Sequence, residues 1–388
     1  MTTSHTLVIP TYNRPGNLGR LLGYLERAGF DSPVLVFDSS SAENRSENLE
    51  LCNASPMDVT HFGFDEEIHP FVKMREGLQN VRTDFCSACA DDDLVFVDSL
   101  AELFEVLETN TAYAAVHGNY VNFKESDSVF RIVSVAQRGS QAASENALQR
   151  VREFMSDYTV LFYALFRTEV MQACFAPMDA LRTTLMRELA SSTLAVANGP
   201  VVRRDLFYMG RNTDESASYD AWHPHQILAT EPEVLFKDFA AFRTLLAETV
   251  DRVDNHPDRN TTALLDLLAL RYLAPFLRSD VIDFIVQEKM VLNHDSRTTV
   301  ENLWATFVAT PNRTKHPQVP LFEDNNWTFA PGVLHPNAPR QDYLAEGRGP
   351  DGSRTYFLHN ELFFEDGSPI CTLGREATEF LLDEFDRY

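Results

Sequence analysis

Alternation of strand-like and helix-like segments over residues 5–125 constrains the fold of this chain more than any other feature. Short apolar runs predict buried strands at residues 6–10, 34–37, 59–64, 85–90 and 112–116. The segments between them carry apolar residues at helical spacing, as the leucines after Pro15 do. Ser99 and Glu102 form a capping-box pattern, which predicts a helix start at Ser99. This β-α-β-α order predicts an α/β fold, with a Rossmann-like, mostly parallel sheet and helices on both faces.

The pattern changes from about residue 119. Two antiparallel strands are expected at 120–123 and 130–135, helices near 144–156, 168–175 and 180–196, and one more strand at 201–209. Residues 238–309 have mainly helical periodicity, and residues 311–352, rich in Pro, Asn and Gly, predict a long surface connection. Residues 355–373, with a turn at Asp366-Gly367, predict a small antiparallel β-meander before a final helix. We therefore expect one domain over residues 1–237 and a C-terminal helical extension with a terminal meander over residues 238–388.

Charge and hydropathy exclude several classes of partner. The chain has 33 Lys and Arg against 57 Asp and Glu, a net charge of −24. Such a surface repels phosphate backbones and anionic lipids, so we expect no nucleic-acid partner. The longest apolar stretch, residues 159–166, is far shorter than the roughly 20 residues of a membrane-spanning helix. The first residues also lack the pattern of a secretory signal, so a cytoplasmic location is expected.

Cys86 and Cys89 form a C-x-x-C pair within an apolar run. Such a pair can serve redox chemistry or supply half of a zinc site. However, residues three apart on a strand face opposite sides, and no second C-x-x-C follows. We therefore expect buried structural thiols in a reducing compartment.

Polar residues gather directly after three of the expected strands. These clusters are residues 10–14, residues 38–41 and residues 91–93. Open parallel sheets bind ligands beyond the carboxyl ends of their strands, so the three clusters are expected to meet in one crevice.

The third cluster consists of three adjacent carboxylates, Asp91, Asp92 and Asp93. Their mutual repulsion is relieved by a cation, and hard oxygen ligands suit Mg²⁺ or Mn²⁺, which commonly bridge carboxylates to substrate phosphates. A solvated acidic loop that caps the next helix is the alternative. Together with Asp38 and the 10–14 cluster on neighbouring strands, the triplet favours a metal site.

Three stretches together resemble the family-2 glycosyltransferases with the glycosyltransferase-A (GT-A) fold. They are TLVIPTYNRPGNLGRLLGYL, VLVFDSSS and CSACADDDLVF. The resemblance is strong over residues 5–125 and looser over 145–210. It implies an enzyme that moves a sugar from a nucleotide-sugar donor to a hydroxyl acceptor (a glycan, small molecule or protein) with Mn²⁺ or Mg²⁺. Residues 1–118 would then be the nucleotide-binding half of the domain, and residues 119–237 the acceptor-binding half.

The resemblance also implies roles for individual residues. Asp38 would hydrogen-bond the base or ribose, and Asp91 and Asp93 would form a D-x-D element, with Asp93 on the metal and Asp91 near the ribose or also on the metal. Other residues implied to contact the nucleotide sugar are Pro10, Thr11, Arg14, Lys73, Arg75, Asp92 and Arg211. For Lys73 and Arg75 an exposed helix face is the alternative. His223 or His225 would complete the metal site, although Pro224 between them is equally compatible with a simple loop.

The chain departs from the family pattern at several positions. Ser39 stands where a second acidic residue is common, and the Q-x-x-R-W signature is absent, so a processive membrane synthase is not expected. The usual Glu-Asp pair of the catalytic base is missing. Glu188 stands at a comparable distance and is our candidate base for an inverting transfer, with Asp179 as second choice. The alternative for Glu188 is a carboxylate on a helix surface beside Arg182 or Arg187.

Other functions remain open at this point. Asp91-x-Asp93-Leu94-Val95 also resembles the D-x-D-x-[TV] element of haloacid-dehalogenase-type phosphatases, but three expected strands precede it. A sugar nucleotidyltransferase would need a Gly-rich basic loop after the first strand. A non-catalytic module that binds a sugar nucleotide or glycan is the remaining alternative. For residues 238–388 acceptor binding or homo-oligomerisation is expected.

Overall fold

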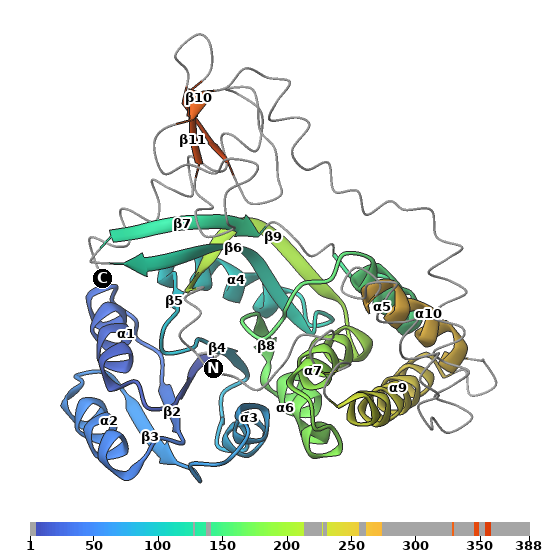
Figure 1. The fold of residues 1–388 in the computed structure, drawn as a ribbon, viewed down its shortest axis with the longest axis horizontal. Helices are drawn as coiled ribbons and strands as arrows, with labels where there is room; N and C mark the ends of the chain where they lie inside the picture. Colours follow the sequence, from blue (N-terminus) through green and yellow to red (C-terminus); the bar gives the residue numbers. More distant parts are fainter. Residues whose placement is uncertain are drawn as a thin grey trace.

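A mixed sheet forms the centre of the computed structural model (Figure 1). The structure describes residues 5–126, 129–136, 141–212, 227, 231–255, 261–273, 328–329, 345–348 and 354–357. The nine strands of the central sheet follow the order β3-β2-β1-β4-β8-β6-β9-β5, with β7 paired to β6. The strands β1 (His5–Thr11), β2 (Val34–Asp38), β3 (Val59–Gly63) and β4 (Phe85–Ala88) form its parallel half.

The other half of the sheet is mixed. β8 (Leu165–Arg167) pairs antiparallel with both β4 and β6 (Ala115–Ser126). β6 pairs in parallel with β9 (Val201–Asn212) and antiparallel with β7 (Val129–Ala136). The two-residue strand β5 (Leu94–Val95) closes the order against β9. β8 therefore lies antiparallel between β4 and β6, which run in the same direction.

Alternating side chains of the buried strands build two cores, one on each face of the sheet. In β1, Leu7 and Ile9 belong to one core and Val8 belongs to the other. The first core is covered by α1 (Pro15–Arg27), α2 (Ala42–Ala54) and α4 (Val97–Thr109). The second is covered by α3 (Pro70–Leu78), α6 (Thr168–Phe175), the 3-10 helix η1 (Ala176–Ala180) and α7 (Thr184–Asn198). Helices thus lie on both faces, as the sequence predicts.

Three further helices extend the second core. α5 (Ala147–Ser156), α9 (Pro232–Asp254) and α10 (Thr261–Leu273) lie side by side beyond α6 and α7 (Figure 1). Their apolar residues, including Phe154, Phe242 and Leu265, pack into the same core as β1 and β2. None of the helices in the described ranges is long and apolar enough to cross a membrane.

Most elements expected from the sequence are present, with several corrections. The strands expected at 112–116 and 120–123 are one continuous strand, β6. The run at 85–90 forms a strand only to Ala88, and the short strands β5 and β8 were not expected. The capping box at Ser99 and Glu102 is wrong. The helix begins earlier, at Val97, because the chain leaves its pairing with β9 at Val95 and turns there.

The C-terminal part also differs from expectation. The boundary expected between residues 237 and 238 falls within the continuous helix α9. Residues 311–352, expected to be a connection, include β10 (Thr328–Phe329) and β11 (Ala345–Arg348), which form an antiparallel sheet with β12 (Arg354–Phe357). The turn expected at Asp366-Gly367 and the final helix lie outside the described residues.

Buried polar contacts fix the helices of the second core to one another. The guanidinium of Arg150 on α5 donates to the carbonyl oxygens of Val196 and Ala197, both 2.8 Å away, at the end of α7. It also donates to the carbonyl oxygens of Ser144 and Glu145. Val196 and Ala197 are buried in the last turn of α7, where carbonyls lack intrahelical donors, so Arg150 supplies the hydrogen bonds that these two groups need.

We predict that Arg150→Met lowers the free energy of unfolding by about 3 kcal/mol or more, because each buried carbonyl left without a donor costs about 1–3 kcal/mol. Denaturant unfolding of the purified protein measures this loss. Arg152→Met is the matched control, since Arg152 is exposed on the same helix, and this change should stay within about 0.5 kcal/mol. Equal effects of the two substitutions would contradict the role given to Arg150.

Candidate active site

The polar segments after β1, β2 and β4 meet at one edge of the sheet. The three strands are parallel neighbours in the order β2-β1-β4, so their carboxyl ends lie together. The hydroxyl of Thr11 donates to Asp91 Oδ2 at 2.6 Å, which joins the first segment to the third. The backbone N–H of Asn13 donates to the hydroxyl of Ser40 at 2.8 Å, which joins the first to the second. The three segments that were expected to meet are therefore joined to one another at this edge of the sheet.

Arg14 provides the positive charge next to the Asp triplet. Its guanidinium lies 2.8 Å from Asp91 Oδ1 and also pairs with the carboxylate of Asp92. Asp91 is fully buried, and burial raises its pKa to about 6, while the charge of Arg14 opposes this rise. Asp91 Oδ1 accepts no hydrogen bond within the described residues, despite its ionic contact with Arg14. A buried carboxylate oxygen with spare acceptor capacity suits a ligand at this position.

Asp93 connects the Asp triplet to the mixed half of the sheet. Its Oδ1 accepts a hydrogen bond of 2.7 Å from the backbone N–H of Asn212, the last residue of β9. Burial raises the pKa of Asp93 to about 8, and the neighbouring charge of Asp92 adds to this effect. The positive charge of Arg211 and a hydrogen bond from Tyr163 oppose it. Tyr163 was not identified from the sequence, because it lies on the segment before the unexpected strand β8.

Lys73 is buried between two of the strand-end segments. Its ammonium donates to the carbonyl oxygen of Thr11 at 2.7 Å and to the hydroxyl of Ser39 at 2.8 Å. Helix α3 comes close enough for this because Gly77 faces β2, where a Cβ would lie 2.3 Å from the ring of Phe37. Burial lowers the pKa of Lys73 to about 8, although the charges of Asp38 and Asp91 oppose the shift. An exposed helix face is therefore wrong for Lys73.

Arg75, two residues further along α3, is not part of this cluster. Its guanidinium pairs with Asp179 of η1 and, at 2.8 Å, with Glu76. Asp179, the second candidate for a base, is half exposed in this pair. A contact of Arg75 with a diphosphate stays a prediction and would require these pairs to open.

Asp38 is held by partners on three sides. Its carboxylate accepts hydrogen bonds from the backbone N–H of Ser40 at 2.7 Å and from the amide of Asn48 at 2.9 Å, and His61 Nε2 lies 2.9 Å away. Burial would raise the pKa of Asp38, but the contacts with His61, Ser40 and Asn48 outweigh it and hold the pKa well below its usual range. No part of Asp38 is exposed, so a nucleoside could reach it only by displacing a partner. Direct contact with a nucleoside stays a prediction.

The turn after β1 depends on Asn13, a residue that the sequence did not single out. Asn13 adopts a left-handed backbone conformation with a φ of 55°, which Asn tolerates better than most residues. Its side-chain oxygen accepts hydrogen bonds from the backbone N–H of Ser41 at 2.8 Å and from Asn44 at 3.0 Å. Pro10 is paired with Phe37 just before this turn. The turn thereby holds Thr11 and Arg14 against the Asp triplet.

Glu188 lies near Arg211, which also interacts with Asp93. Burial raises the pKa of Glu188, while the charge of Arg211 and a hydrogen bond from Tyr158 oppose the rise. Burial would lower the pKa of Arg211, but Tyr163, Tyr120, Asp93 and Glu188 together raise it. The guanidinium of Arg211 lies over the ring of Tyr163, 5.9 Å from its centroid. Arg211 therefore links the candidate base electrostatically to the Asp triplet.

The expected third metal ligand is not among the residues that the structure describes. His223 and His225 both lie outside them. Within the described ranges no three His, Cys, Asp or Glu side chains are grouped as a metal site. Cys86 and Cys89 are free and buried in opposite cores, and burial raises the pKa of the Cys86 thiol to about 12. The expectation of structural thiols is confirmed for these two.

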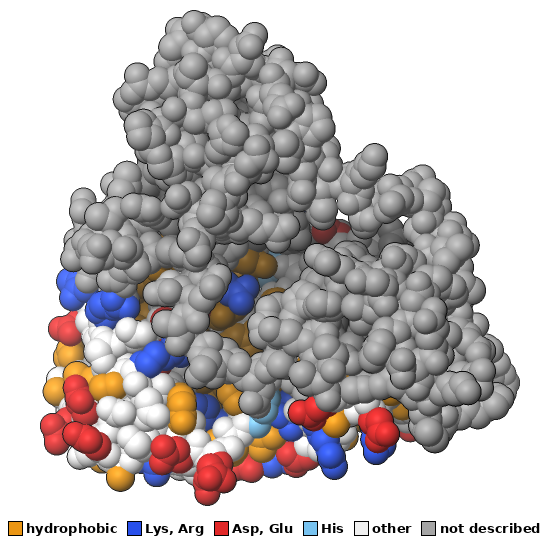
Figure 2. Space-filling model, in the orientation of Figure 1, with side chains coloured by type: hydrophobic (Ala, Val, Ile, Leu, Met, Phe, Trp, Pro, Cys, Tyr) orange, Lys and Arg blue, Asp and Glu red, His pale blue; other side chains and the backbone are white. Residues whose placement is uncertain are grey.

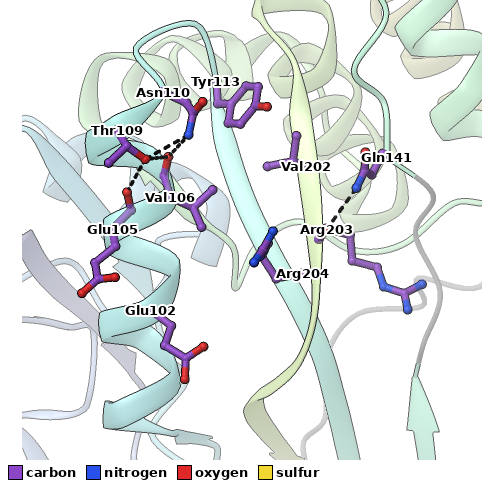
Figure 3. Close-up of a pocket in the computed structure, with 10 residues that line it drawn as sticks. All are labelled: Glu102, Glu105, Val106, Thr109, Asn110, Tyr113, Gln141, Val202, Arg203 and Arg204. Atoms are coloured by element: carbon purple, nitrogen blue, oxygen red, sulfur yellow. Dashed lines mark hydrogen bonds between the residues drawn. The ribbon is translucent and has the colours of Figure 1, made fainter.

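A separate cleft of about 430 Å³ lies between the end of α4 and the start of β9 (Figure 3). It is lined by Glu102, Glu105, Val106, Thr109, Asn110, Tyr113, Gln141, Val202, Arg203 and Arg204. The side chains of Thr109 and Asn110 are already bonded to carbonyl oxygens of their own helix. β9 runs parallel to β6 and ends at the strand-end cluster, so the start of β9 lies at the opposite edge of the sheet. The cleft is therefore not part of the candidate active site.

The surface around the cluster reflects the negative charge of the chain. In the lower part of Figure 2, over α2, β3 and α3, many Asp and Glu side chains are exposed. The exposed acidic residues of α2 and of the segment between β3 and α3 include Glu43, Glu47, Glu50, Glu66 and Glu67. The cationic groups Arg14, Lys73 and Arg211 are instead gathered at the carboxyl edge of the sheet. An anionic ligand is therefore favoured at this edge rather than over α2.

Comparison with known proteins identifies the N-terminal part of the chain. Residues 6–174 match the model of glycosyl transferase family 2. This segment, which is less than half of the chain, is similar to that family, and the protein is a family-2-like glycosyltransferase. The match runs from β1 into α6, so Glu188 and Arg211 lie beyond it. No curated protein matches the sequence.

Two glycosyltransferases are among the solved structures that match this chain. TarS 1–349 from S. aureus in complex with UDP-GlcNAc shares 15% identity and a TM-score of 0.44, over 92% of this chain and 99% of TarS 1–349. The mannosyltransferase PcManGT from Pyrobaculum calidifontis, in complex with GDP-Man and Mn²⁺, shares 16% identity and a TM-score of 0.40, over 79% of this chain and 85% of its own.

We predict that Asp38→Asn lowers the free energy of unfolding by about 2–3 kcal/mol at pH 7. The pKa of Asp38 is lower in the folded protein than its value of about 3.9 in an unfolded chain. Its contribution is therefore complete above pH 4 and is lost as the pH falls below that value. The difference between wild type and variant, measured by denaturant unfolding, should shrink from pH 4 downward.

Asp58→Asn is the control, because Asp58 is exposed just before β3. A difference between wild type and Asp38→Asn that is independent of pH would show that the carboxylate charge is not what the three partners stabilise.

Proposed function

We propose that this glycosyltransferase moves a sugar from a nucleoside-diphosphate donor to a hydroxyl acceptor with inversion, aided by a divalent cation and with Glu188 as base. The observation that carries the proposal is the electrostatic link through Arg211. Arg211 interacts with Asp93 of the donor-side triplet and with Glu188 of α7. With a donor bound at the Asp triplet, the carboxylate of Glu188 would lie near the sugar, where it can act on the acceptor hydroxyl. Cationic groups would lie near the diphosphate.

The carboxylates at the strand ends fit a divalent cation. Asp91 Oδ1 is buried and has an ionic contact with Arg14 but no hydrogen bond within the described residues, and Asp93 is buried beside another carboxylate. Hard oxygen ligands of this kind suit Mg²⁺ or Mn²⁺, which retain open positions for phosphate oxygens. Asp93 and Asp91 would hold the ion, and His223 or His225 is proposed as a further ligand. When bound, the ion would neutralise charge that develops on the diphosphate leaving group.

Protein cations would assist departure of the diphosphate. Arg14 pairs with Asp91 and Asp92 at the end of β1, and Arg211 stands at the end of β9. Lys73 is buried, so it would not contact the diphosphate directly. Its positive charge would act from behind the loops that it holds in place. Preorganised charges of this kind stabilise a transition state without reorganisation.

Glu188 would accept the proton of the acceptor hydroxyl. A sugar hydroxyl is a poor nucleophile at neutral pH, so it requires a base within hydrogen-bond reach. Burial raises the pKa of Glu188 toward the operating range of a base, and Arg211 and Tyr158 keep the ionised form accessible. One base on the side of the sugar opposite the leaving group suffices for inversion.

The competing functions lack support from the site. The D-x-D residues follow β4 rather than the first strand, unlike the phosphatase element. A degenerate binding module would not require both a buried D-x-D pair and a carboxylate of raised pKa. The buried free thiols favour a reducing compartment, so we propose a cytoplasmic enzyme.

We predict that Asp93→Asn reduces metal-dependent transfer by about 10²–10³-fold, the loss typical of removing one electrostatic stabiliser. Release of nucleoside diphosphate from a panel of nucleotide sugars, with Mn²⁺ or with excess EDTA, measures the effect. Asp98→Asn, an exposed carboxylate in the first turn of α4, is the control. Full turnover by the wild type in excess EDTA would exclude the metal.

We predict that Glu188→Gln lowers kcat by about 10²–10⁴-fold with little change in donor affinity, because a positioned base contributes that much. Glu169→Gln, exposed on α6, is the control and should behave as wild type. Proton NMR of the product gives the anomeric configuration. Retention of configuration together with an active Glu188→Gln variant would contradict the proposed mechanism.

A further inference from the structure

Helix α10, from the part of the chain where the sequence showed no functional motif, reaches the surroundings of Glu188. α10 packs against α5 and α9 in the second core. Its Tyr272 meets the ring of Tyr158 edge to face, with centroids 4.7 Å apart and planes at 63°. Tyr158 also contacts Phe154 of α5, with centroids 5.2 Å apart. Tyr158 is thus held between an aromatic residue of α5 and one of α10.

Tyr158 in turn reaches Glu188. Its hydroxyl donates to Glu188 Oε1 at 3.5 Å, a distance at the outer limit of a hydrogen bond. Hydrogen bonds in active sites without substrate are often long and tighten in the reacting complex. Burial, with the nearby charge of Glu188, keeps the pKa of Tyr158 well above its usual range, so the hydroxyl stays a donor. A small change in the ring position of Tyr158 would therefore decide whether this bond forms.

We infer that Tyr272 is a positioning residue for Glu188 and acts by fixing the ring of Tyr158, so that α10 completes the acceptor side of the active site. The inference rests on the proposed role of Glu188 as base. Edge-to-face aromatic pairs at this separation add stabilisation beyond the area they bury, which gives Tyr158 one preferred orientation. Tyr272 need not touch a substrate for this role.

The groups around Glu188 determine how the hydrogen bond from Tyr158 affects the pKa of Glu188. Arg211 of β9 and the hydroxyl of Tyr158 favour the ionised carboxylate. Burial raises the pKa of Tyr272 above its usual range, and the charge of Glu188, which is within electrostatic range, adds to this rise. Loss of the Tyr158 hydrogen bond would raise the pKa of Glu188. Because the base must be ionised, the acidic limb of the kcat profile would then move to higher pH.

The test is the pH dependence of kcat in the full-length protein. Tyr158→Phe removes the donor and should move the acidic limb upward by about one pH unit, the size expected for a hydrogen bond to a charged group. Tyr272→Ala should produce most of the same shift, and Tyr272→Phe, which keeps the ring, should retain the wild-type profile. In Tyr158→Phe combined with Tyr272→Ala the shift should equal that of Tyr158→Phe alone.

Two controls separate this role from general loosening of the fold. Leu268→Ala weakens packing of α10 on the same core, and its profile should keep the wild-type midpoint. Tyr272→Leu fills most of the space without an aromatic edge, so it replaces Tyr272→Ala if the latter does not fold. A wild-type midpoint in a folded Tyr272→Ala or Tyr272→Leu variant would overturn the inference.

Failure of the inference and failure of the proposed function give different results. If Glu188→Gln is inactive but the tyrosine variants keep the wild-type midpoint, Glu188 remains the base and only the role of Tyr272 is wrong. If Glu188→Gln retains wild-type kcat, the proposed base is wrong and the inference falls with it.

Discussion

Burial of carboxylates at the carboxyl edge of the sheet is the constraint on which the rest of the structure depends. An ionised carboxylate without partners is very costly in a protein interior. Asp38 is stabilised by hydrogen-bonding partners from three segments, whereas Asp91 relies on Thr11 and Arg14. Asp93 uses a backbone N–H of β9 and the charge of Arg211. Since these partners come from distant parts of the sequence, the carboxylates can be accommodated only when the whole edge is assembled.

Much of this edge could be predicted from the sequence, because each strand is a local apolar run and its polar end follows directly. The order of parallel strands then brought Thr11, Asp38 and the Asp triplet together without knowledge of individual contacts. The long strand β6 and the short strands β5 and β8 could not be predicted. Two or three residues carry no measurable periodicity, and their pairing with β9, β4 and β6 is set by tertiary contacts. The early start of α4 follows from the same pairing.

The residues that contact the buried carboxylates and shift their pKa values were harder to predict than the carboxylates themselves. Tyr163 and Tyr158 lie before the unexpected strand β8, and no motif distinguishes them from core aromatics. The enclosure of Asp38 depends on Asn48 and His61, on α2 and β3, which the sequence spacing does not relate to it. Lys73 and Arg75 are close in sequence, yet one is buried between the loops and the other pairs with η1. The two side chains point in different directions because residues two apart on a helix lie on different sides of it, and α3 turns the side with Lys73 toward the strand-end loops.

Helix α7, which carries Glu188, is fixed at both ends. Asp238 lies beyond the segment that matches family 2, and Arg150 lies near the end of that segment. Asp238 of α9 accepts from the backbone N–H groups of Arg182 and Thr183 just before α7, and Arg150 binds the carbonyls at its end. Asp254, at the other end of α9, accepts from the backbone N–H groups at the start of α5. One helix of the extension therefore sets the position of both α5 and α7. The contacts of α9 and of Arg150 therefore help to set the position of Glu188 relative to Arg211 and Tyr158.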